Sequence, residues 1–314
     1  MSKQIEKIKK KNSPTLKERG TTIREVMRKA QRVDNDEFYT RPEDVEKELG
    51  MYPISMWKNK TVFCNCDDAV DNSGKNTSAF PLYFLQNFRK LELKKLICTH
   101  YAGGTKGYIF TKEGYSEIKD YDKLKKYPEN YNGSFDHPLS LEILKKDTDI
   151  VCTNPPFSRA IDFWEILINS GKKFVIISNI TNAINTAYIP YFMNNKVWAG
   201  YNRVDYFLTQ KKELTDASGH WYTNIPIKDR PKYKHLKIIP LKEIPYKNRR
   251  YDDSKTLLVD NCYIPGDYKR KFAISSRPIL NGLLEKGYTI VSDKRYTPYI
   301  NGKECFARVL VQKM

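Results

Sequence analysis

The stretch Asp149–Phe157 places chemically useful residues at one fixed point of the chain. An apolar, strand-like run ends there in Asn154-Pro155-Pro156-Phe157. Two consecutive prolines donate no backbone hydrogen bonds and fix two φ angles, and the residue before them is kept out of the helical region. The Asn154 side-chain oxygen and the Pro155 carbonyl can accept hydrogen bonds from an amino group, and the Phe157 ring can stack on a plane. The loop therefore suits a flat substrate that carries an –NH2 group.

An ordinary turn after a strand is the alternative interpretation, because a four-residue match carries a risk of false positives. The residues before the motif, Leu144 to Thr153, form a polar turn that leads into an apolar strand. This context favours the functional interpretation.

The elements that must position this loop alternate along the chain. Apolar runs predict buried strands at 61–66, 95–100, 149–153 and 174–178, and a short strand at 197–200. Helical patterns fall at 41–49, 77–91, 158–169 and 183–195, and residues 102–134 suggest a loop or a small hairpin. Strands alternating with helices predict an α/β fold with a doubly wound parallel sheet.

Local signals set several helix ends. Thr40 and Glu43 have capping-box spacing, Ser158 can cap the helix that follows the motif, and Gly171 suits that helix's end. Beyond residue 200 prolines recur and helical periodicity is weak, which predicts an irregular, mainly β region. The expected organisation is a basic arm at 1–33, a catalytic domain at 34–200 and a second region at 201–314.

The charge of the chain points to a polyanionic partner. Lys and Arg number 55 and Asp and Glu 37, a net charge of +18. Residues 1–33 carry eleven basic residues against three Glu, and residues 228–250 carry nine against two acids, with Tyr and His between them. Such clusters neutralise phosphates, and the aromatic rings can stack on unpaired bases. A lysine-rich proteome is the alternative explanation of the total.

Cysteine use and hydropathy indicate the kind of cellular compartment in which the protein works. The six cysteines include Cys64-x-Cys66 without a matching second pair, so a zinc site is not expected. Four of the six lie in apolar, strand-like runs, as reduced core cysteines do. No run of about 18 apolar residues exists, so no membrane span is expected. A cytoplasmic protein without a metal is the prediction.

Three features occur in a fixed order: an aromatic pair before a helix, an acidic turn after the first strand, and the Asn-Pro-Pro-Phe loop. The tetrapeptide resembles the catalytic motif of S-adenosylmethionine-dependent amino-methyltransferases, and the order resembles the EcoRI-type family of adenine-specific DNA methyltransferases. The segments that carry the resemblance are Asp36–Thr40, Val62–Asp68, Lys94–Ile97, Asp149–Phe157, Lys172–Ile177, Val197–Gly200, Trp221–Asn224 and Ile300–Lys303. It thus covers about Asp34 to the C-terminus.

The resemblance implies a Rossmann-like methyltransferase sheet followed by a C-terminal target-recognition region. It implies site-specific methyl transfer from S-adenosyl-L-methionine to the 6-amino group of adenine in double-stranded DNA, with the base flipped out of the stack. The catalytic residues would be Asn154, Pro155, Pro156 and Phe157, with Phe157 stacked on the base. No obligate protein partner is evident, and the resemblance leaves open whether a cognate restriction endonuclease accompanies a bacterial or phage-encoded enzyme.

Cofactor contacts follow from the same resemblance. The residues that it places there are Phe38, Tyr39, Thr40, Asn65, Asp67, Asp68 and Asp136. Phe38-Tyr39 could instead be a hydrophobic staple, and the choice between Asp67 and Asp68 stays open. The chain departs from the general pattern in two places. His100 stands where an acidic ribose ligand is usual, and Ser134 replaces an expected acid, which leaves Asp136 as the candidate.

The C-terminal region contains side chains that could read base edges. These are Arg203, Asn224, Arg230, Arg249, Arg250, Arg270 and Arg277. Phosphate contact or solvation is the simpler role for most of them. Two alternative functions keep the fold: an RNA adenine methyltransferase, and a non-catalytic DNA-binding protein. A glutamine methyltransferase fits the long basic C-terminal region less well.

Overall fold

The structure is a computed structural model, and it describes the chain from Phe38 onward. The described residues are 38–69, 78–101, 107–118, 131–209, 213–227, 236–244, 249–253, 255–259 and 262–314. Phe38–Met314 forms one compact unit, distinct from Met1–Glu37. The predicted basic arm at 1–33 lies outside the described residues.

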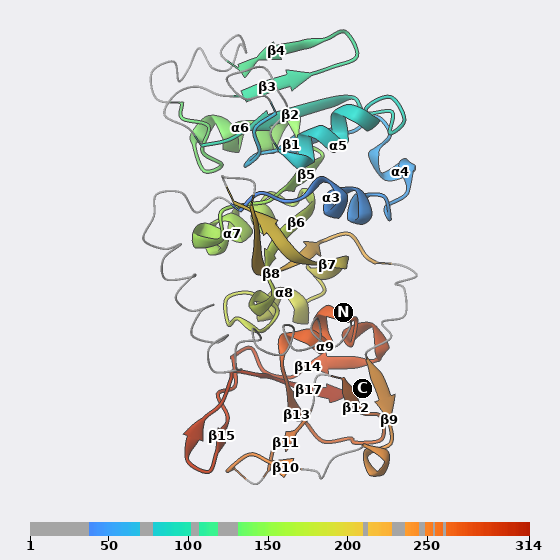
Figure 1. The fold of residues 1–314 in the computed structure, drawn as a ribbon, viewed down its shortest axis with the longest axis vertical. Coiled ribbons are helices and arrows are strands. Elements are labelled where there is room, and N and C mark those ends of the chain that lie inside the picture. Colours follow the sequence, from blue (N-terminus) through green and yellow to red (C-terminus); the bar gives the residue numbers. More distant parts are fainter. Residues whose placement is uncertain are drawn as a thin grey trace, which may run out of the picture. The chain divides into compact units, whose positions relative to one another are not determined.

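An eight-stranded sheet lies at the centre of this unit, with the strand order β4-β3-β2-β1-β5-β6-β8-β7 (Figure 1). The strands are β1 (Thr61–Cys64), β2 (Lys95–Thr99), β3 (Gly107–Phe110), β4 (Tyr115–Glu117), β5 (Ile150–Thr153), β6 (Lys173–Asn179), β7 (Trp198–Leu208) and β8 (Leu214–Thr223). The four central strands β2, β1, β5 and β6 pair in parallel. Antiparallel pairs extend the sheet at both edges, β3–β4 at one and β8–β7 at the other.

Helices cover both faces of the sheet, so the predicted doubly wound α/β fold is confirmed. One face carries α3 (Pro42–Leu49), α4 (Ile54–Trp57) and α5 (Ala79–Asn87); the other carries α6 (Pro138–Asp147), α7 (Ala160–Ser170) and α8 (Ile189–Met193) (Figure 1). Side chains of β6 alternate between the two cores: Val175 and Ile177 face one, Phe174 and Ile176 the other. A parallel strand buried on both sides reads as a continuous apolar run, which is why the sequence identified it.

Two predicted helix starts are wrong in detail. Thr40 and Glu43 form no capping box: the N-cap of α3 is Arg41, without a side-chain cap, and Glu43 pairs with Arg41 at 3.3 Å. Pro42 at the first helical position lacks an N–H, so one donor needs no cap. Ser158 caps no helix either, because the 3-10 turn η3 (Phe157–Arg159) precedes α7. Gly171 ends α7 in the left-handed region (φ 66°), as predicted.

The β7–β8 hairpin carries the sheet past residue 200, the predicted end of the catalytic domain. That boundary falls inside β7, which is far longer than the expected strand at 197–200. The register shifts between Ala199 and Arg203 and again between Val204 and Tyr206. Bulges of this kind break the alternation that a sequence pattern relies on, so only the first residues of the strand were visible as one.

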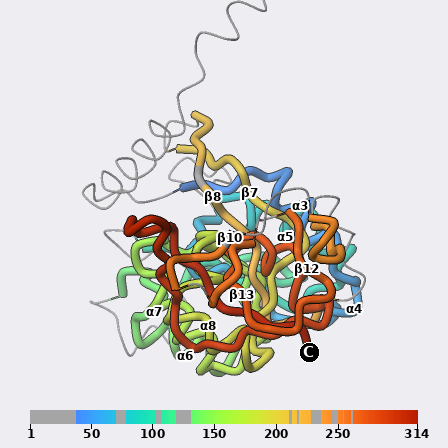
Figure 2. Tube along the Cα trace, turned by 90° about the horizontal axis from the view of Figure 1, so that it is seen from below, coloured from blue at the N-terminus to red at the C-terminus, as the bar shows by residue number. Residues whose placement is uncertain are grey.

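The region after β8 is mainly β, as expected. Its five-stranded sheet has the order β10-β11-β13-β17-β14: β10 (Arg249–Arg250), β11 (Leu257–Leu258), β13 (Phe272–Ile274), β17 (Val309–Lys313) and β14 (Tyr288–Ile290). Two small pairs accompany it, β9 (Lys237–Ile239) with β12 (Tyr263–Pro265), and β15 (Tyr299–Ile300) with β16 (Lys303–Glu304). The remaining elements are η5 (Leu241–Glu243), α9 (Ser276–Leu280) and η6 (Leu284–Lys286). Strands β10, β12 and β13 of this region are labelled in Figure 2.

This C-terminal region shares a hydrophobic core with one face of the central sheet. Helix α9 packs on η4 (Ile180–Ile184), and α8 packs on β14. Buried Phe272, Ile274 and Val311 belong to the same cluster as Trp164 and Tyr222. The two parts are therefore held together by apolar packing.

A buried carboxylate ties α3 to the bulged end of β7. Glu48 is fully buried and accepts hydrogen bonds from the backbone N–H groups of Tyr201 and Asn202, each at 2.8 Å, and from the Asn202 amide and the Tyr52 hydroxyl. A Cβ at Gly200 would clash with Glu48 and with Trp221, so glycine is required there. The bulge leaves strand N–H groups unpaired, and the carboxylate satisfies them.

Among the described residues, no helix is both long and apolar enough to cross a membrane.

Substitution of Glu48 should change how stability depends on pH. Burial raises the pKa of Glu48 from 4.5 to about 7, although its hydrogen bonds lower it. The pKa of Glu48 is higher in the folded protein than in the unfolded chain. Its contribution to the free energy of unfolding is therefore complete at low pH and is lost as the pH rises toward 7. Glu48→Gln removes this loss, which is roughly 3 kcal/mol for a shift of this size.

Urea unfolding of both proteins at pH 5 and pH 8 measures the difference. Glu46→Gln, at an exposed position of the same helix, is the control. The wild-type protein should lose more stability than Glu48→Gln between the two pH values; equal losses would contradict the assignment.

Candidate active site

The predicted site residues gather at the carboxyl edge of the parallel strands. Strand β1 is followed by Asn65 to Asp68, β2 by His100, and β5 by Asn154. Carboxyl ends of parallel strands share one edge of a sheet, where ligands bind in doubly wound folds.

Asp67 joins the end of β1 to the start of the Asn-Pro-Pro-Phe loop. Its carboxylate is buried and accepts hydrogen bonds from the Thr153 hydroxyl and from the Asn154 backbone N–H at 3.3 Å. The Thr153 hydroxyl in turn accepts a bond from the Cys66 N–H at 3.1 Å, and Asp67 N–H donates to Thr99 at 3.1 Å. Three strand ends are thereby held in one network.

The segment Phe38-Tyr39 forms the opposite wall. Tyr39 and Leu208 exchange two backbone hydrogen bonds of 2.8 Å, so the segment lies as a one-residue strand against the end of β7. The Phe38 ring lies 6.0 Å from the rings of Phe157 and Phe207, and Phe157 meets Phe207 edge to face at 5.7 Å. Phe38 thus packs on the Asn-Pro-Pro-Phe loop and on β7. A hydrophobic staple at the start of α3 would not require either contact.

Phe207 and Leu208 are residues of the site that sequence reasoning missed. Phe207 is fully buried and touches both aromatic motifs, while Leu208 positions the backbone of Tyr39. The signal available was one phenylalanine between Tyr206 and Leu208, in a stretch that fits any half-buried strand.

The Asn154 side chain bridges the two walls. Its amide nitrogen donates to the backbone oxygen of Phe38, which fixes the orientation of the group. Its side-chain oxygen is buried and has no hydrogen-bond partner among the described residues. The site therefore holds a fixed acceptor for an incoming N–H.

Further buried polar side chains around this edge lack hydrogen-bond partners in the described part of the chain, Asn65 and Thr40 among them. Asn65 is 1% exposed, and neither its amide oxygen nor its nitrogen is hydrogen-bonded; the Thr40 hydroxyl is also unpaired. Buried polar groups are almost always paired, so each such group calls for an explanation. A polar ligand at the strand ends would supply one.

Asp68 and Asp136 lie in different surroundings. Asp68 is less buried than Asp67, and its carboxylate lies 3.5 Å from His100 Nδ1. Asp136 accepts hydrogen bonds from Arg159 at 2.7 Å and from Ser134. The Arg159 guanidinium holds the pKa of Asp136 below its usual value, and it also lies over the Phe135 ring at 4.7 Å. Arg159 therefore ties the end of the motif loop to the segment that holds Asp136.

Several candidate base readers prove to have other duties. Asn224 accepts from Phe174 N–H at 2.8 Å and donates to the Lys172 carbonyl at 2.7 Å, so its amide fastens the start of β6 and is not available to read a base. Arg203 pairs with Asp205 at 2.6 Å. Arg203, Arg250, Arg270 and Arg277 are exposed; Arg230 and the side chain of Arg249 lie outside what is described.

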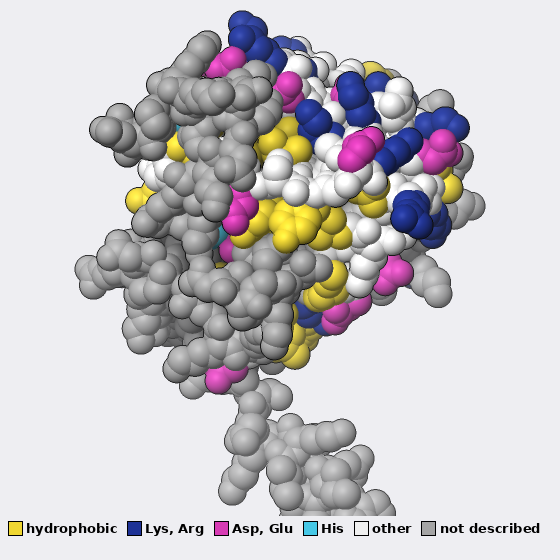
Figure 3. All heavy atoms as spheres, turned by 90° about the horizontal axis from the view of Figure 1, so that it is seen from above, with side chains coloured by type: hydrophobic (Ala, Val, Ile, Leu, Met, Phe, Trp, Pro, Cys, Tyr) yellow, Lys and Arg dark blue, Asp and Glu magenta, His cyan; other side chains and the backbone are white. Residues whose placement is uncertain are grey.

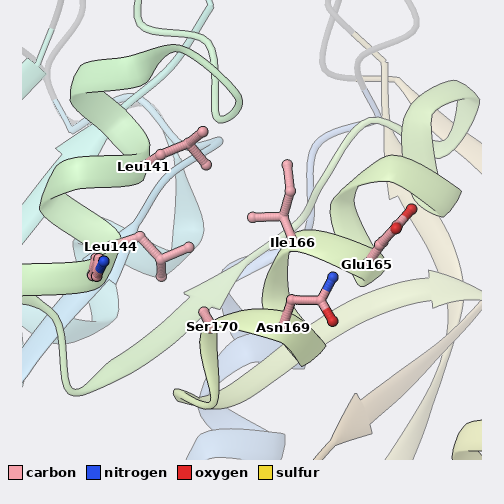
Figure 4. Close-up of a pocket in the computed structure, with 7 residues that line it drawn as sticks. Leu141, Leu144, Glu165, Ile166, Asn169 and Ser170 are labelled. Atoms are coloured by element: carbon pink, nitrogen blue, oxygen red, sulfur yellow. The ribbon is translucent and has the colours of Figure 1, made fainter.

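A groove lies away from these residues, between α6 and α7 (Figure 4). Its volume is about 470 Å³. The residues that line it are Leu141, Leu144, Lys145, Glu165, Ile166, Asn169 and Ser170. It includes the last turn of α7, whereas the motif loop precedes the first turn, so the groove is separate from the strand-end site.

No group of three or more His, Cys, Asp or Glu side chains is placed to hold a metal ion in the described ranges. All cysteines are free thiols, and Cys64, Cys98 and Cys152 are buried core residues.

Comparison with known proteins gives one family. The family model described as "adenine-specific methyltransferase EcoRI" matches residues 26–281. No solved structure matches the chain.

Three curated relatives are type II methyltransferases. M.MgeORF184P of Mycoplasma genitalium is 28% identical over 327 residues, which cover 91% of this chain and 98% of that protein. M.EcoRI of Escherichia coli is 34% identical over 187 residues (56% of this chain, 55% of the relative). M.MpnI of Mycoplasma pneumoniae is 32% identical over 173 residues (55% and 50%).

Replacement of Phe207 by leucine should loosen the Phe38-Tyr39 wall. Leucine keeps apolar volume but loses both ring contacts, so the Tyr39–Leu208 pairing should open more often. Hydrogen exchange followed by mass spectrometry should show faster exchange, by about tenfold or more, for the Tyr39 and Leu208 amides. Phe192→Leu, a buried aromatic of the other core, is the control; equal protection of both amides in Phe207→Leu and in the wild-type protein would exclude the positioning role.

Proposed function

This chain belongs to the EcoRI family of adenine-specific methyltransferases, and from that premise we propose how it acts. Family membership makes it an adenine-specific DNA methyltransferase. Membership leaves open the methyl donor, the form of the DNA and the roles of individual residues. S-adenosylmethionine is the proposed donor, and a flipped adenine of duplex DNA is the proposed acceptor.

One observation carries the assignment of the catalytic site. Asn154 stands at the carboxyl edge of the sheet with its nitrogen bonded to Phe38 and its oxygen buried without a partner among the described residues. A buried acceptor of this kind, fixed before the substrate arrives, matches the 6-amino group of adenine. The same edge brings together the aromatic, acidic and Pro-Pro motifs.

The chain's residues would act by positioning and by polarity. The lone pair of the adenine amine is delocalised into the ring, which makes the amine a poor nucleophile. Hydrogen bonds from the amine to Asn154 Oδ1 and the Pro155 carbonyl would favour tetrahedral geometry at nitrogen and localise the lone pair. S-adenosylmethionine, when bound, supplies a methyl group already activated on a sulfonium sulfur, so preorganised acceptors can provide the rate.

Phe157 is proposed to stack on the base through its free surface. The ring is only half-buried, although Phe38 and Phe207 pack on it. Asp67 is proposed as a positioning residue, because its carboxylate holds Thr153 and the Asn154 backbone.

Cofactor binding is assigned to the polar and aromatic groups around the strand ends. Asn65 and Thr40 offer buried groups without partners in the described chain, and Asp68 offers a carboxylate suited to the cofactor's ammonium group. Phe38 and Tyr39 supply the adjoining wall, and Asp136 remains the candidate for the adenosine end. These groups fit a ligand that carries an amino acid and a nucleoside.

DNA contacts are assigned to the basic N-terminal arm and to the region after β8. The catalytic part then ends at Thr223, where β8 leaves the central sheet. Whether the enzyme works beside a restriction endonuclease is a property of its genetic setting.

Asn154→Ala should abolish methylation. Loss of a preorganised group at the reacting atom costs about 100-fold or more in rate. Modification-sensitive long-read sequencing of DNA from cells that express either protein is the measurement. Methylated adenine in one short sequence, absent with Asn154→Ala and present with the exposed-site control Asn194→Ala, is expected. Turnover retained by Asn154→Ala would remove the assigned role, and modified RNA with unmodified DNA would move the substrate to RNA.

Asp68→Ala and Asp67→Asn should have separable effects. The first should weaken S-adenosylmethionine binding by about tenfold, the usual value of one charge-assisted contact. The second should lower the rate of methyl transfer with a smaller change in cofactor affinity, because Asp67 acts through Asn154. Calorimetry with the purified chain gives the affinities, and Asp216→Ala is an exposed control. The reverse pattern would exchange the two assignments.

A further inference from the structure

A two-stranded ribbon in the C-terminal region displays aromatic side chains to solvent. The ribbon (residues 296–308) contains β15 and β16 and projects from the C-terminal sheet (Figure 1). Phe306 is 77% exposed, more than any other aromatic side chain in the described part of the chain, and Tyr299 is 47% exposed. Single exposed apolar residues are common on protein surfaces. Whether these two rings form a binding surface therefore depends on how firmly the backbone that carries them is held.

The turn of the ribbon is held in place. Asn301 (φ 53°) and Gly302 (φ 70°) are both left-handed, as a two-residue turn between strands requires. The Asp252 carboxylate accepts hydrogen bonds from the N–H groups of both residues, each at 2.8 Å. Asp252 N–H in turn donates to the Tyr299 carbonyl at 2.9 Å. One aspartate therefore fixes the tip and one strand.

The base of the ribbon is fixed as well. Tyr296 and Arg308 exchange two backbone hydrogen bonds of 2.8 Å, and the Tyr296 hydroxyl donates to Asp253 at 2.9 Å. The Arg308 guanidinium donates to the carbonyls of Phe306 and Ala307, each at 3.1 Å. The exposed rings thus stand on a preorganised backbone, which lowers the entropy cost of binding a partner.

The exposed charges around the ribbon have a small positive excess. Five exposed basic side chains lie on the ribbon, on the residues just before it and on the Arg250–Leu257 turn that it packs against: Arg250, Lys255, Lys294, Arg295 and Lys303. Four exposed acids lie on the same stretches: Asp252, Asp253, Asp293 and Glu304. Asp252 and Asp253 use their oxygens in hydrogen bonds within the protein, and the five basic residues leave an excess of one positive charge (5 − 4 = +1). The described surface at the β4 end of the molecule also mixes basic, acidic and hydrophobic side chains (Figure 3).

We propose that the ribbon enters a groove of the substrate duplex, with Phe306 and Tyr299 against base steps and Lys303 on a phosphate. This rests on the proposed function. Two-stranded ribbons fit DNA grooves, and apolar wedges such as phenylalanine stabilise bent or partly unstacked steps. The ribbon lies beyond residues 26–281, the part matched by the family model. It would contribute affinity and sequence preference to the binding of the duplex.

The test compares DNA affinity of full-length Phe306→Ala, Lys303→Ala and wild-type protein. The probe is a fluorescent duplex that contains the sequence found methylated, with a scrambled duplex beside it. Phe306→Ala should weaken binding of the methylated-site duplex by about tenfold, the size of a lost aromatic contact. Lys303→Ala should reduce the slope of log affinity against log salt by about one. Tyr115→Ala, at a 70% exposed aromatic on β4, and Lys112→Ala are matched controls.

Cofactor affinity and thermal unfolding should be unchanged in every variant, since the exposed side chains support no core. If Phe306→Ala binds the duplex as tightly as the wild-type protein does, and the wild-type protein methylates DNA, the ribbon's role is overturned and the proposed function stands. If the wild-type protein is a dimer and Phe306→Ala is a monomer with unchanged DNA affinity, the ribbon's role is also overturned. The Phe306 ring would then serve contact between two copies of the chain. Wild-type protein that neither binds duplex nor methylates it would overturn the proposed function, and the ribbon's role with it.

Discussion

The site depends on how the last backbone donor before two prolines is satisfied. Pro155 and Pro156 have no N–H, so Asn154 is the final donor of β5, and Asp67 accepts its hydrogen bond together with that of Thr153. A buried carboxylate is costly unless it is hydrogen-bonded, and here its partners are the residues whose position matters. The end of β1 and the start of the motif loop are consequently fixed to one another, and the Asn154 side chain points in one direction.

Strand β7 provides a second constraint from outside the parallel core. The segment from Phe38 to Leu49 is tied to this strand at both ends, by the Tyr39–Leu208 pairing and by the bonds from Glu48 to Tyr201 and Asn202. The aromatic wall therefore depends on a bulge far from it along the chain. The carboxyl group of Glu48 is accommodated inside the protein because N–H groups left unpaired by the bulge donate to it.

Catalytic and DNA-contacting duties place different demands on the chain. Methyl transfer needs acceptors held to a fraction of an ångström, and the network around Asp67 supplies this rigidity within the parallel sheet. Contact with a duplex needs exposed, positively charged and aromatic groups, which the C-terminal region can present on short strands and turns. The shared apolar core between the two parts keeps one in register with the other.

The sequence by itself determined the parallel core and the motif loop. Strands buried on both faces are continuous apolar runs, and the Pro-Pro pair restricts its backbone wherever it occurs, so residues 150–153 and 173–179 were identifiable without a structure. Gly171 ended its helix because a left-handed residue is a local requirement. The sequence could not show how Asp67 and Asp68 differ, because their partners come from other strands. Pairing of the strands brings Thr153 and Asn154 to Asp67, and it brings His100 to Asp68. Tertiary structure likewise decided three further features. These are the contact of Phe207 with Phe38 and Phe157, the hydrogen bonds of Asn224 to the start of β6, and the length of β7. Each depends on residues tens of positions apart, and on bulges that break the alternation a sequence reading relies on.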